Sequence, residues 1–254
     1  MNTEGTQSIE RTLDVLEALS DARHGMGVTE LANRVGLHKS TAHRIVCALA
    51  QRGYVTKRQD DGHYQIGIKL IELVSYYINS LELQTEARPF VAQISTELGL
   101  IGHLGVLEGD QVIYIERMDF LTGNKLYSQI GQRVHAYCSS LGKCLLCKFS
   151  KEQLAVTMKD CSFNRFTPAT ISSLDTLWEE LLLVRERGWA MDNMEYSSNS
   201  RCIGAPVYDY RGEIIAALSA SGSPTMLTLE RIDEVAACVV AKAADLSRNL
   251  GYVP

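Results

Sequence analysis

The sequence lacks any apolar run that approaches the roughly 18 to 20 residues a membrane-spanning helix needs. Its opening, MNTEGTQSIERTL, carries acidic and polar residues before its first apolar positions, so we expect no secretory leader there. We therefore expect a cytoplasmic protein that does not contact a membrane.

The cysteines lack the pattern of a disulfide framework. There are seven of them, at irregular spacing and mostly among apolar neighbours, as in IVCAL and AACVV. A reducing compartment disfavours disulfides, and core packing explains this placement. Cys144 and Cys147 form one CxxC, but a structural zinc site needs a second ligand pair. We expect no metal and no cofactor, and a redox role for Cys138, Cys144 or Cys147 stays open.

The chain also lacks an overall positive charge, since 25 basic and 30 acidic side chains give a net charge of -5. The distribution is more informative, because residues 28–58 carry six basic side chains and one acidic one. Salt confines the field of exposed charges to about 10 Å. This basic block can therefore bind a polyanion although the whole chain is acidic.

Three short helical patterns open the chain. In the first, SIERTLDVLEALS, Ser8 stands where an N-cap belongs, and an apolar residue returns every three or four positions. The pattern predicts a helix that buries one face, formed by Ile9, Leu13, Leu16 and Leu19.

The second and third helices are separated by only a few residues. TELANRV predicts a helix capped by Thr29 and ended by Gly36. The next helix is expected over 38–52, with Gly53 ending it. Its apolar residues follow the spacing of a one-sided helix: Ala42, Ile45, Val46 and Leu49.

A hairpin follows these helices. YVTKRQDDGHYQIG predicts two short strands around an Asp-Asp-Gly turn. Helix, helix, turn, helix and hairpin is the order of a winged helix-turn-helix. We expect this DNA-binding domain over residues 1–67.

The start of the third helix has the chemistry that a DNA groove requires. Basic, imidazole and hydroxyl groups suit base edges and phosphates, and five such residues face outward: Lys39, Ser40, Thr41, His43 and Arg44. Phosphate contacts are expected from Thr29, Arg52, Lys57 and Arg58. The alternative is an ordinary helix whose polar face is simply exposed to solvent. It would explain the charges, but not the apolar packing positions, the glycine turn and the hairpin that forms the wing. We therefore predict binding to double-stranded DNA.

A linker helix is expected next, over residues 68–84, and Pro89 is expected to begin a second helix. The linker has an apolar stripe, which we interpret as a dimer contact, with packing on its own domain as the alternative. The stripe consists of Ile71, Val74, Ile78 and Leu81.

The remaining residues, 85–254, alternate strands and helices. Hairpins are predicted around Gly109-Asp110 and Arg211-Gly212, and a strand at KLYSQIG. Helices are predicted over 139–149, 151–159, 173–187 and 228–250. Hairpins imply antiparallel pairing with helices packed on the sheet, so the expected fold class is α+β.

Together these segments resemble the IclR family of bacterial transcriptional regulators over residues 8–251. The resemblance is carried by five stretches: SIERTLDVLEAL, TELANRVGLHKSTAHRIVCAL, GYVTKRQDDGHYQIGIKLIEL, IGQRVHAYCSSLGKCLL and RCIGAPVYDYRGEIIAALSASG. It implies a winged helix-turn-helix, a linker helix and a C-terminal effector domain related to GAF and PAS sensors. It also implies homodimers or homotetramers on a palindromic operator, commonly acting as repressors of catabolic operons.

The resemblance further implies a C-terminal site for a small organic acid, such as a sugar acid or an aromatic acid. The matching positions are Ser140, Leu141, Asp192, Cys202, Gly204, Ser219 and Ser221. The residue types suit this role. SSLGK opens a helix whose N–H groups attract anions, the two serines of SAS share one strand face, and Asp192 would accept hydrogen bonds from hydroxyl groups.

The chain departs from the family pattern in two places. Asn193, Met194 and Asn199 stand where the family commonly has acidic residues and a glycine, with only Glu195 acidic. This alters the rim of the expected pocket and leaves the identity of the ligand open. His38 replaces a common capping serine, which affects only the start of a helix.

Two other classes of protein are alternatives. An enzyme or redox sensor could use His135, Ser139, Cys144 and Asp192 as a nucleophilic set, but no nucleophile-elbow motif supports it. A winged-helix module that binds another protein would make the basic face incidental. We expect a regulator and not an enzyme.

Overall fold

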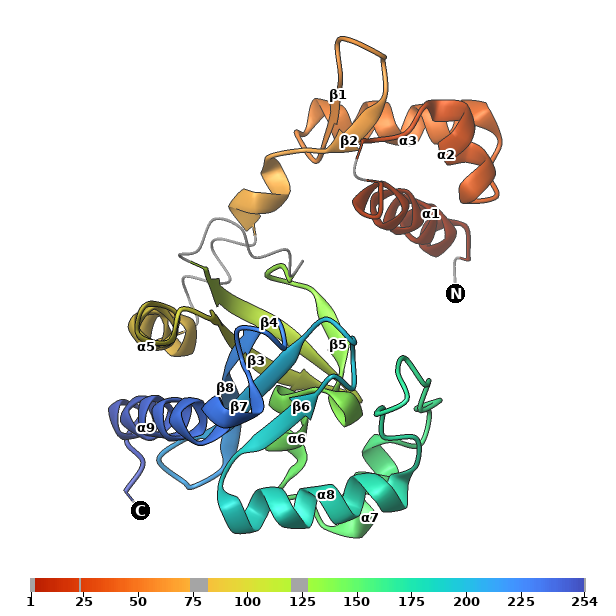
Figure 1. Cartoon of the computed structure of the whole chain (residues 1–254). Coiled ribbons are helices and arrows are strands. Elements are labelled where there is room, and N and C mark those ends of the chain that lie inside the picture. The colour runs from red at the N-terminus through yellow and green to blue at the C-terminus, as the bar shows by residue number, and fades with distance from the viewer. Residues whose placement is uncertain (1–2, 23, 74–81, 120–127, 254) are drawn as a thin grey trace. The chain divides into compact units, whose positions relative to one another are not determined.

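The computed structural model describes residues 3–22, 24–73, 82–119 and 128–253, and the chain divides into two units, Met1–Ser80 and Leu81–Pro254. The first unit contains α1 (Thr3–Ser20), α2 (Val28–Arg34), α3 (Lys39–Gln51), β1 (Val55–Lys57) and β2 (Tyr64–Ile66). Figure 1 shows these five elements. One core joins them through residues such as Leu19, Leu31, Val46, Val55 and Tyr64. This confirms the winged helix-turn-helix.

The first helix differs from the prediction at its start. It begins at Thr3, so Ser8 lies inside it and is not an N-cap. Ile9 and Leu13 are 63% and 51% exposed, whereas Val15 and Leu19 are buried. The reason is that the core contributed by α2, α3 and the wing meets only the second half of α1.

The ends of α2 and α3 are set by glycines more than by hydroxyl caps. Gly27 precedes α2 in an extended conformation, so Thr29 lies in the first turn and is not the cap. Gly36 and Gly53 adopt positive φ angles of 65° and 79°, as a chain leaving a helix requires. The turn between α2 and α3 therefore has the predicted geometry.

The expected linker helix is only partly described. Residues 69–73 are helical, and residues 74–81 lie outside the described part of the chain, with Val74, Ile78 and Leu81 of the predicted stripe among them. Ile71 is 61% exposed. Helix α5 (Glu82–Leu98) contains Pro89 in its interior, so the prediction that Pro89 begins a helix is wrong. Burial of Val91 and Ile94 offsets the hydrogen bond that a proline removes.

The second unit is built on a six-stranded antiparallel sheet with the order β5-β4-β3-β8-β7-β6. The strands are β3 (Ile101–Glu108), β4 (Gln111–Met118), β5 (Arg133–His135), β6 (Ala190–Asn193), β7 (Arg201–Tyr208) and β8 (Ile214–Gly222). Both predicted hairpins are present, as β3–β4 and β7–β8. Pairing of β3 with β8 joins the two hairpins into one sheet.

Helices cover both faces of this sheet (Figure 1). On one face, α5 and α9 (Ile232–Asn249) pack over a core that includes Leu104, Leu218 and Val239. The other core contains α6 (Ser140–Leu146), α7 (Lys151–Thr157) and α8 (Leu174–Arg187). Two short 3-10 turns, Ala136–Cys138 and Leu229–Arg231, precede α6 and α9. This arrangement confirms the α+β class.

Two details of the second unit were not predicted correctly. Residues 125–127 of KLYSQIG lie outside the described residues, residues 128–131 form no strand, and the edge strand starts at Arg133. Strand β6 was missed because AMDN is short and polar. In the described part of the chain, no helix has the length and apolar character to cross a membrane.

Candidate functional site

The proposed DNA-binding residues of α3 lie on its outward side. Lys39, Ser40, His43 and Arg44 are exposed, and Thr41 is half-buried. On the opposite side, the methyl and isopropyl groups of Ala42 and Val46 are completely buried. Burial of the second set fixes the rotation of the helix, and this rotation presents the first set as one polar surface.

The basic residues around the wing have different surroundings. Arg52 and Lys57 are exposed, and the Lys57 ammonium lies 5.7 Å from the centre of the Tyr64 ring. Arg58 is half-buried and donates to both carboxylate oxygens of Asp60, at 2.6 and 3.1 Å. The charge of Arg58 is therefore largely neutralised within the chain. Thr29 is exposed in the first turn of α2.

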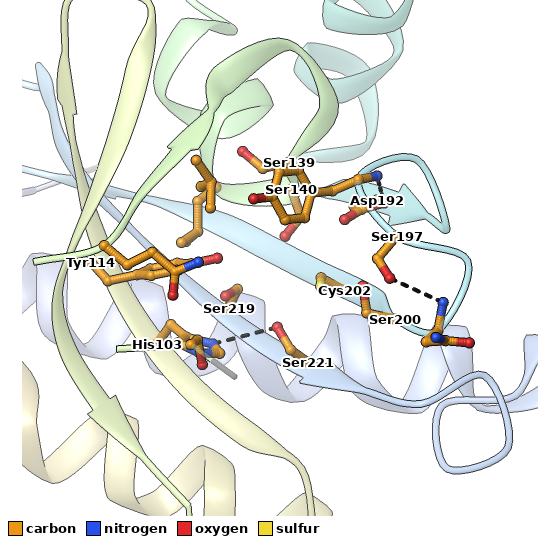
Figure 2. A pocket seen from close by; sticks show the side chains of 16 residues that line it. His103, Tyr114, Ser139, Ser140, Asp192, Ser197, Ser200, Cys202, Ser219 and Ser221 are labelled. Carbon is orange, nitrogen blue, oxygen red and sulfur yellow. Dashed lines mark hydrogen bonds between the residues drawn. The ribbon is translucent and has the colours of Figure 1, made fainter. Parts of the chain in front are cut away.

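The second unit contains a cavity of about 400 Å³ beside β8, β7 and the first turn of α6 (Figure 2). Six of the seven proposed effector residues line it: Ser140, Leu141, Asp192, Cys202, Ser219 and Ser221. Residues that were not predicted also line it, among them His103, Tyr114, Ser128, Gln132, Ser139 and Tyr196. Most of these contribute hydroxyl, amide or imidazole groups.

Strand register explains why residues far apart in sequence meet here. Asp192 on β6 is opposite Cys202 on β7, which is opposite Ser221 on β8. Ser219, two residues before, is opposite His103 on β3. Because side chains two apart share a face, these five residues form a continuous polar floor across four strands.

Gly204 does not line the cavity, although it was predicted to be part of it. A Cβ at this position would lie 3.2 Å from the carbonyl oxygen of Ser140. Gly142 is more tightly enclosed, because its Cβ would come within 2.2 Å of Ala136 Cα. Both glycines let the start of α6 approach its neighbours closely, so their contribution is to the shape of the cavity wall.

Asp192 is buried at one end of this floor, with 2% of its surface exposed. Its Oδ1 accepts hydrogen bonds from the backbone N–H groups of Glu195, at 2.7 Å, and Tyr196, at 3.4 Å. Burial, together with the charge of Glu195, raises the pKa of Asp192 to about 7. The carboxyl group can therefore accept or donate a hydrogen bond near neutral pH.

Lys143 supports the segment that carries Asp192. This lysine is 1% exposed, and its Nζ donates to Glu195 Oε1 at 2.6 Å and to the Met191 carbonyl at 2.7 Å. Burial raises the pKa of Glu195, and Lys143 beside it opposes that rise. The ion pair therefore ties α6 to the turn that follows β6.

His103 occupies the other end of the floor and is 2% exposed. Its Nε2 lies 2.7 Å from Ser128 Oγ, its Nδ1 lies 3.4 Å from Ser221 Oγ, and its ring stacks on Tyr114 with centroids 4.7 Å apart. Burial, with a smaller effect of the Arg117 charge, lowers the pKa of His103 to about 3. The imidazole is neutral at physiological pH.

The wall of the cavity offers hydrogen-bonding groups more than charged ones. Within the described residues, no lysine or arginine lines it, and Asp192 is its one carboxylate. A ligand with several hydroxyl, carbonyl or carboxylate oxygens fits such a wall. A carboxylate in it would be held by neutral donors, as it is in many anion sites built from hydroxyl and amide groups.

The alternative nucleophilic set does not come together at this cavity. Ser139 and Asp192 line it, but His135 and Cys144 do not. Ser139 Oγ already accepts from the Gly142 N–H as the N-cap of α6. Burial raises the pKa of Cys144, as it does for Cys138 and Cys147. Thiols of this kind react slowly as nucleophiles.

Some of the missed residues had no local signal in the sequence. His103 stands in β3, which pairs with β8 far away in sequence, and Tyr114 stands in β4, the hairpin partner of β3. Ser139 and Ser140 are adjacent hydroxyls before a helix; only Ser140 is among the predicted effector residues, and Ser139 belongs to the alternative nucleophilic set. Ser200 lies between a predicted helix and a predicted strand, in a segment without a recognisable motif, and Asn199 beside it is one of the departures expected to alter the pocket rim.

A winged helix-turn-helix joined to a cavity-containing antiparallel domain defines the class of two-domain transcriptional regulators. Family models bear this out: "IclR helix-turn-helix domain" matches residues 8–59, and "Bacterial transcriptional regulator IclR C-terminal" matches residues 75–248. The chain belongs to the IclR family of DNA-binding transcriptional regulators.

Relatives are similar over nearly the whole chain. The HTH-type transcriptional regulator KdgR of Escherichia coli K12 is 31% identical, covering 98% of this chain and 94% of KdgR. The IclR crystal structure from Thermotoga maritima is 28% identical with a TM-score of 0.83, covering 97% of this chain and 100% of that one. An IclR homologue from Microbacterium hydrocarbonoxydans, crystallised with 4-hydroxybenzoate, is 23% identical with a TM-score of 0.84, covering 96% and 98%.

Proposed function

We propose that this chain is a cytoplasmic repressor of a catabolic operon, released from DNA by a small organic acid that binds in the cavity of the second unit. The observation that carries the proposal is the polar cavity itself, which lies in a different unit from the DNA-binding helix. A regulator needs such a separate site, because binding of the effector must change the affinity for DNA. The coupling free energy between two such binding sites is typically about 1–3 kcal/mol.

The DNA side of the proposal rests on the outward residues of α3 and on the wing. Lys39, Ser40, Thr41, His43 and Arg44 would enter the major groove, while Thr29, Arg52, Lys57 and Arg58 would contact phosphates. The operator is a palindrome read by a homodimer or homotetramer. Support for an oligomer comes from exposed apolar side chains at Ile68, Ile71 and Leu73 before the second unit.

The effector side rests on the chemistry of the cavity floor. Ser140, Leu141, Asp192, Cys202, Ser219 and Ser221 would hold the ligand, with Gly204 shaping the wall behind them. The complex of the Microbacterium homologue with 4-hydroxybenzoate supports an acid that also carries a hydroxyl group. Both sugar acids and aromatic hydroxy acids meet this description. No catalytic step is assigned to the cavity.

The experiment is a titration of a labelled duplex from the region upstream of its own gene, followed by fluorescence anisotropy. We expect tighter binding to this duplex than to an unrelated duplex of equal length, and weaker binding when a cognate acid is added. Equal affinity for both duplexes at low ionic strength would contradict DNA-specific regulation. Tighter binding on adding the acid would contradict release from DNA by the effector.

A further inference from the structure

A chain of hydrogen bonds runs along the wall of the cavity at the end opposite Asp192. Arg117 Nε donates to Ser128 Oγ at 3.0 Å, and the same oxygen lies 2.7 Å from His103 Nε2. On the other side of the ring, His103 Nδ1 lies 3.4 Å from Ser221 Oγ. Figure 2 shows the last of these contacts, with Ser221 beside the histidine at the floor of the cavity.

The direction of these hydrogen bonds follows from the neutral state of the imidazole. A neutral ring has one N–H donor and one acceptor nitrogen. The contact of 2.7 Å between Ser128 and Nε2 is typical of a hydroxyl donor and short for an N–H donor. Arg117 donates to the Ser128 oxygen, which leaves the serine hydrogen free to point at Nε2. The proton of the ring is then on Nδ1, which faces Ser221.

We propose that His103 is the positioning residue that makes Ser221 a hydrogen-bond donor to the ligand, so that the hydroxy acid of the proposed function lies with its carboxylate at Ser221 and its hydroxyl at Asp192. This deepens the proposed function and rests on the effector being bound in this cavity. Ser221 Oγ accepts from the Nδ1–H group, and its own hydrogen is left for an oxygen acceptor. A primary amide offers a weaker acceptor and two N–H groups without partners there.

The spacing of the two ends sets the size of the ligand. Ser221, Cys202 and Asp192 are successive partners on β8, β7 and β6, and neighbouring strands are about 4.8 Å apart. The backbones at the two ends are therefore separated by roughly two strand spacings, or about 10 Å. An acid that spans this gap carries its hydroxyl several bonds away from the carboxylate, as a sugar acid or a para-hydroxylated aromatic acid does.

The first experiment needs no ligand. In protein labelled with 15N at histidine, imidazole nitrogen shifts distinguish the two neutral tautomers. We expect the Nδ1–H form of His103 at pH 6 to 8. Ser128→Ala, which removes a half-buried hydroxyl, is expected to populate the other tautomer. An Nε2–H tautomer in the unaltered protein would overturn the proposed direction, whatever the protein binds.

The second experiment measures binding by calorimetry. The probes are gluconate, galacturonate and 4-hydroxybenzoate, each beside its primary amide. We expect at least one acid to bind, at least 10-fold more tightly than its amide. Ser221→Ala and His103→Leu should abolish this preference, whereas His103→Gln, which keeps one acceptor and N–H donors, should retain most of it. Equal affinity of acid and amide, an unchanged preference in His103→Leu that remains folded, or no binding by any of the three acids would overturn the proposed ligand class and orientation.

Failure of this binding mode can be distinguished from failure of the proposed function. A protein that recognises its own upstream duplex but binds no acid would keep its place as a DNA-binding regulator and lose this assignment of the cavity. A protein that binds the acids with the expected preference but does not recognise that duplex would keep the assignment and lose the operator.

Discussion

Lys143 Nζ lies 2.6 Å from Glu195 Oε1, and the side chains of the two residues are 1% and 9% exposed. The pair joins the first turns of α6, which form one wall of the cavity, to the turn that carries Asp192. A buried ion pair of this kind adds little to the free energy of unfolding compared with a well-packed apolar pair in the same place. Removal of one partner is nevertheless costly, because the other charge then stays buried without compensation.

Lys143→Ala should therefore destabilise the protein by about 3 to 5 kcal/mol, because Glu195 would remain buried without its cation. Urea unfolding followed by circular dichroism measures this change. Lys151→Ala is the matched control, since Lys151 pairs with Asp175 on the surface and should cost less than about 1 kcal/mol. Similar losses in both variants would contradict the importance assigned to the buried pair.

Asp192→Asn should make stability less dependent on pH. The pKa of Asp192 is raised to about 7, so between pH 4 and 7 the folded state binds a proton that the unfolded state has released. Wild-type stability therefore falls as pH rises through this window. The asparagine variant has no proton to lose at this position. We therefore expect the difference in free energy of unfolding, variant minus wild type, to be about 1 to 4 kcal/mol more favourable to the variant at pH 8 than at pH 5.

Urea unfolding at both pH values tests this expectation. Asp175→Asn, at an exposed aspartate, is the control and should leave the pH dependence unchanged. A slope for Asp192→Asn as steep as that of the wild type would show that Asp192 titrates normally in the folded protein.

Lys57→Ala should weaken binding to every duplex to a similar extent. Lys57 is exposed on the wing, and loss of one phosphate contact reduces the slope of log affinity against log salt by about 1. Arg58→Ala is the comparison within the same wing, because the Arg58 guanidinium is already paired with Asp60. We expect a smaller change in slope for Arg58→Ala. The reverse order would mean that Arg58 leaves Asp60 when DNA binds.

Arg44→Ala should relax sequence preference. Arg44 is exposed on the outward face of α3, where an arginine can pair with a guanine edge, and such a contact contributes about 1–3 kcal/mol of discrimination. Anisotropy titrations with the upstream duplex and with variants substituted at single base pairs measure this. Unchanged affinity for all of them would remove Arg44 from the DNA-reading residues.

Helix identity could be predicted from the sequence, and so could the ends of α2 and α3 at Gly36 and Gly53, but the starts of α1, α2 and α5 could not. The repeat of Ala42, Val46 and Leu49 fixed the buried side of α3 and therefore its outward side. Ser8 and Thr29 have the chemistry of caps, yet both lie inside helices, because α1 already begins at Thr3 and α2 begins after Gly27. Pro89 is also interior, since the burial of Val91 and Ile94 stabilises the helix through it. The starts of these helices depend on contacts and backbone conformation that the local pattern does not contain.

The amino-acid order alone determined the winged helix-turn-helix, the two hairpins and most of the helices, because these depend on local periodicity and on turn residues close together in the chain. Tertiary structure decided the cavity. His103 and Ser221 are 118 residues apart and meet only because β3 pairs with β8. The pKa values of His103 and Asp192 shift chiefly because packing removes both side chains from water. Pairing between distant strands and desolvation are properties of the folded chain as a whole.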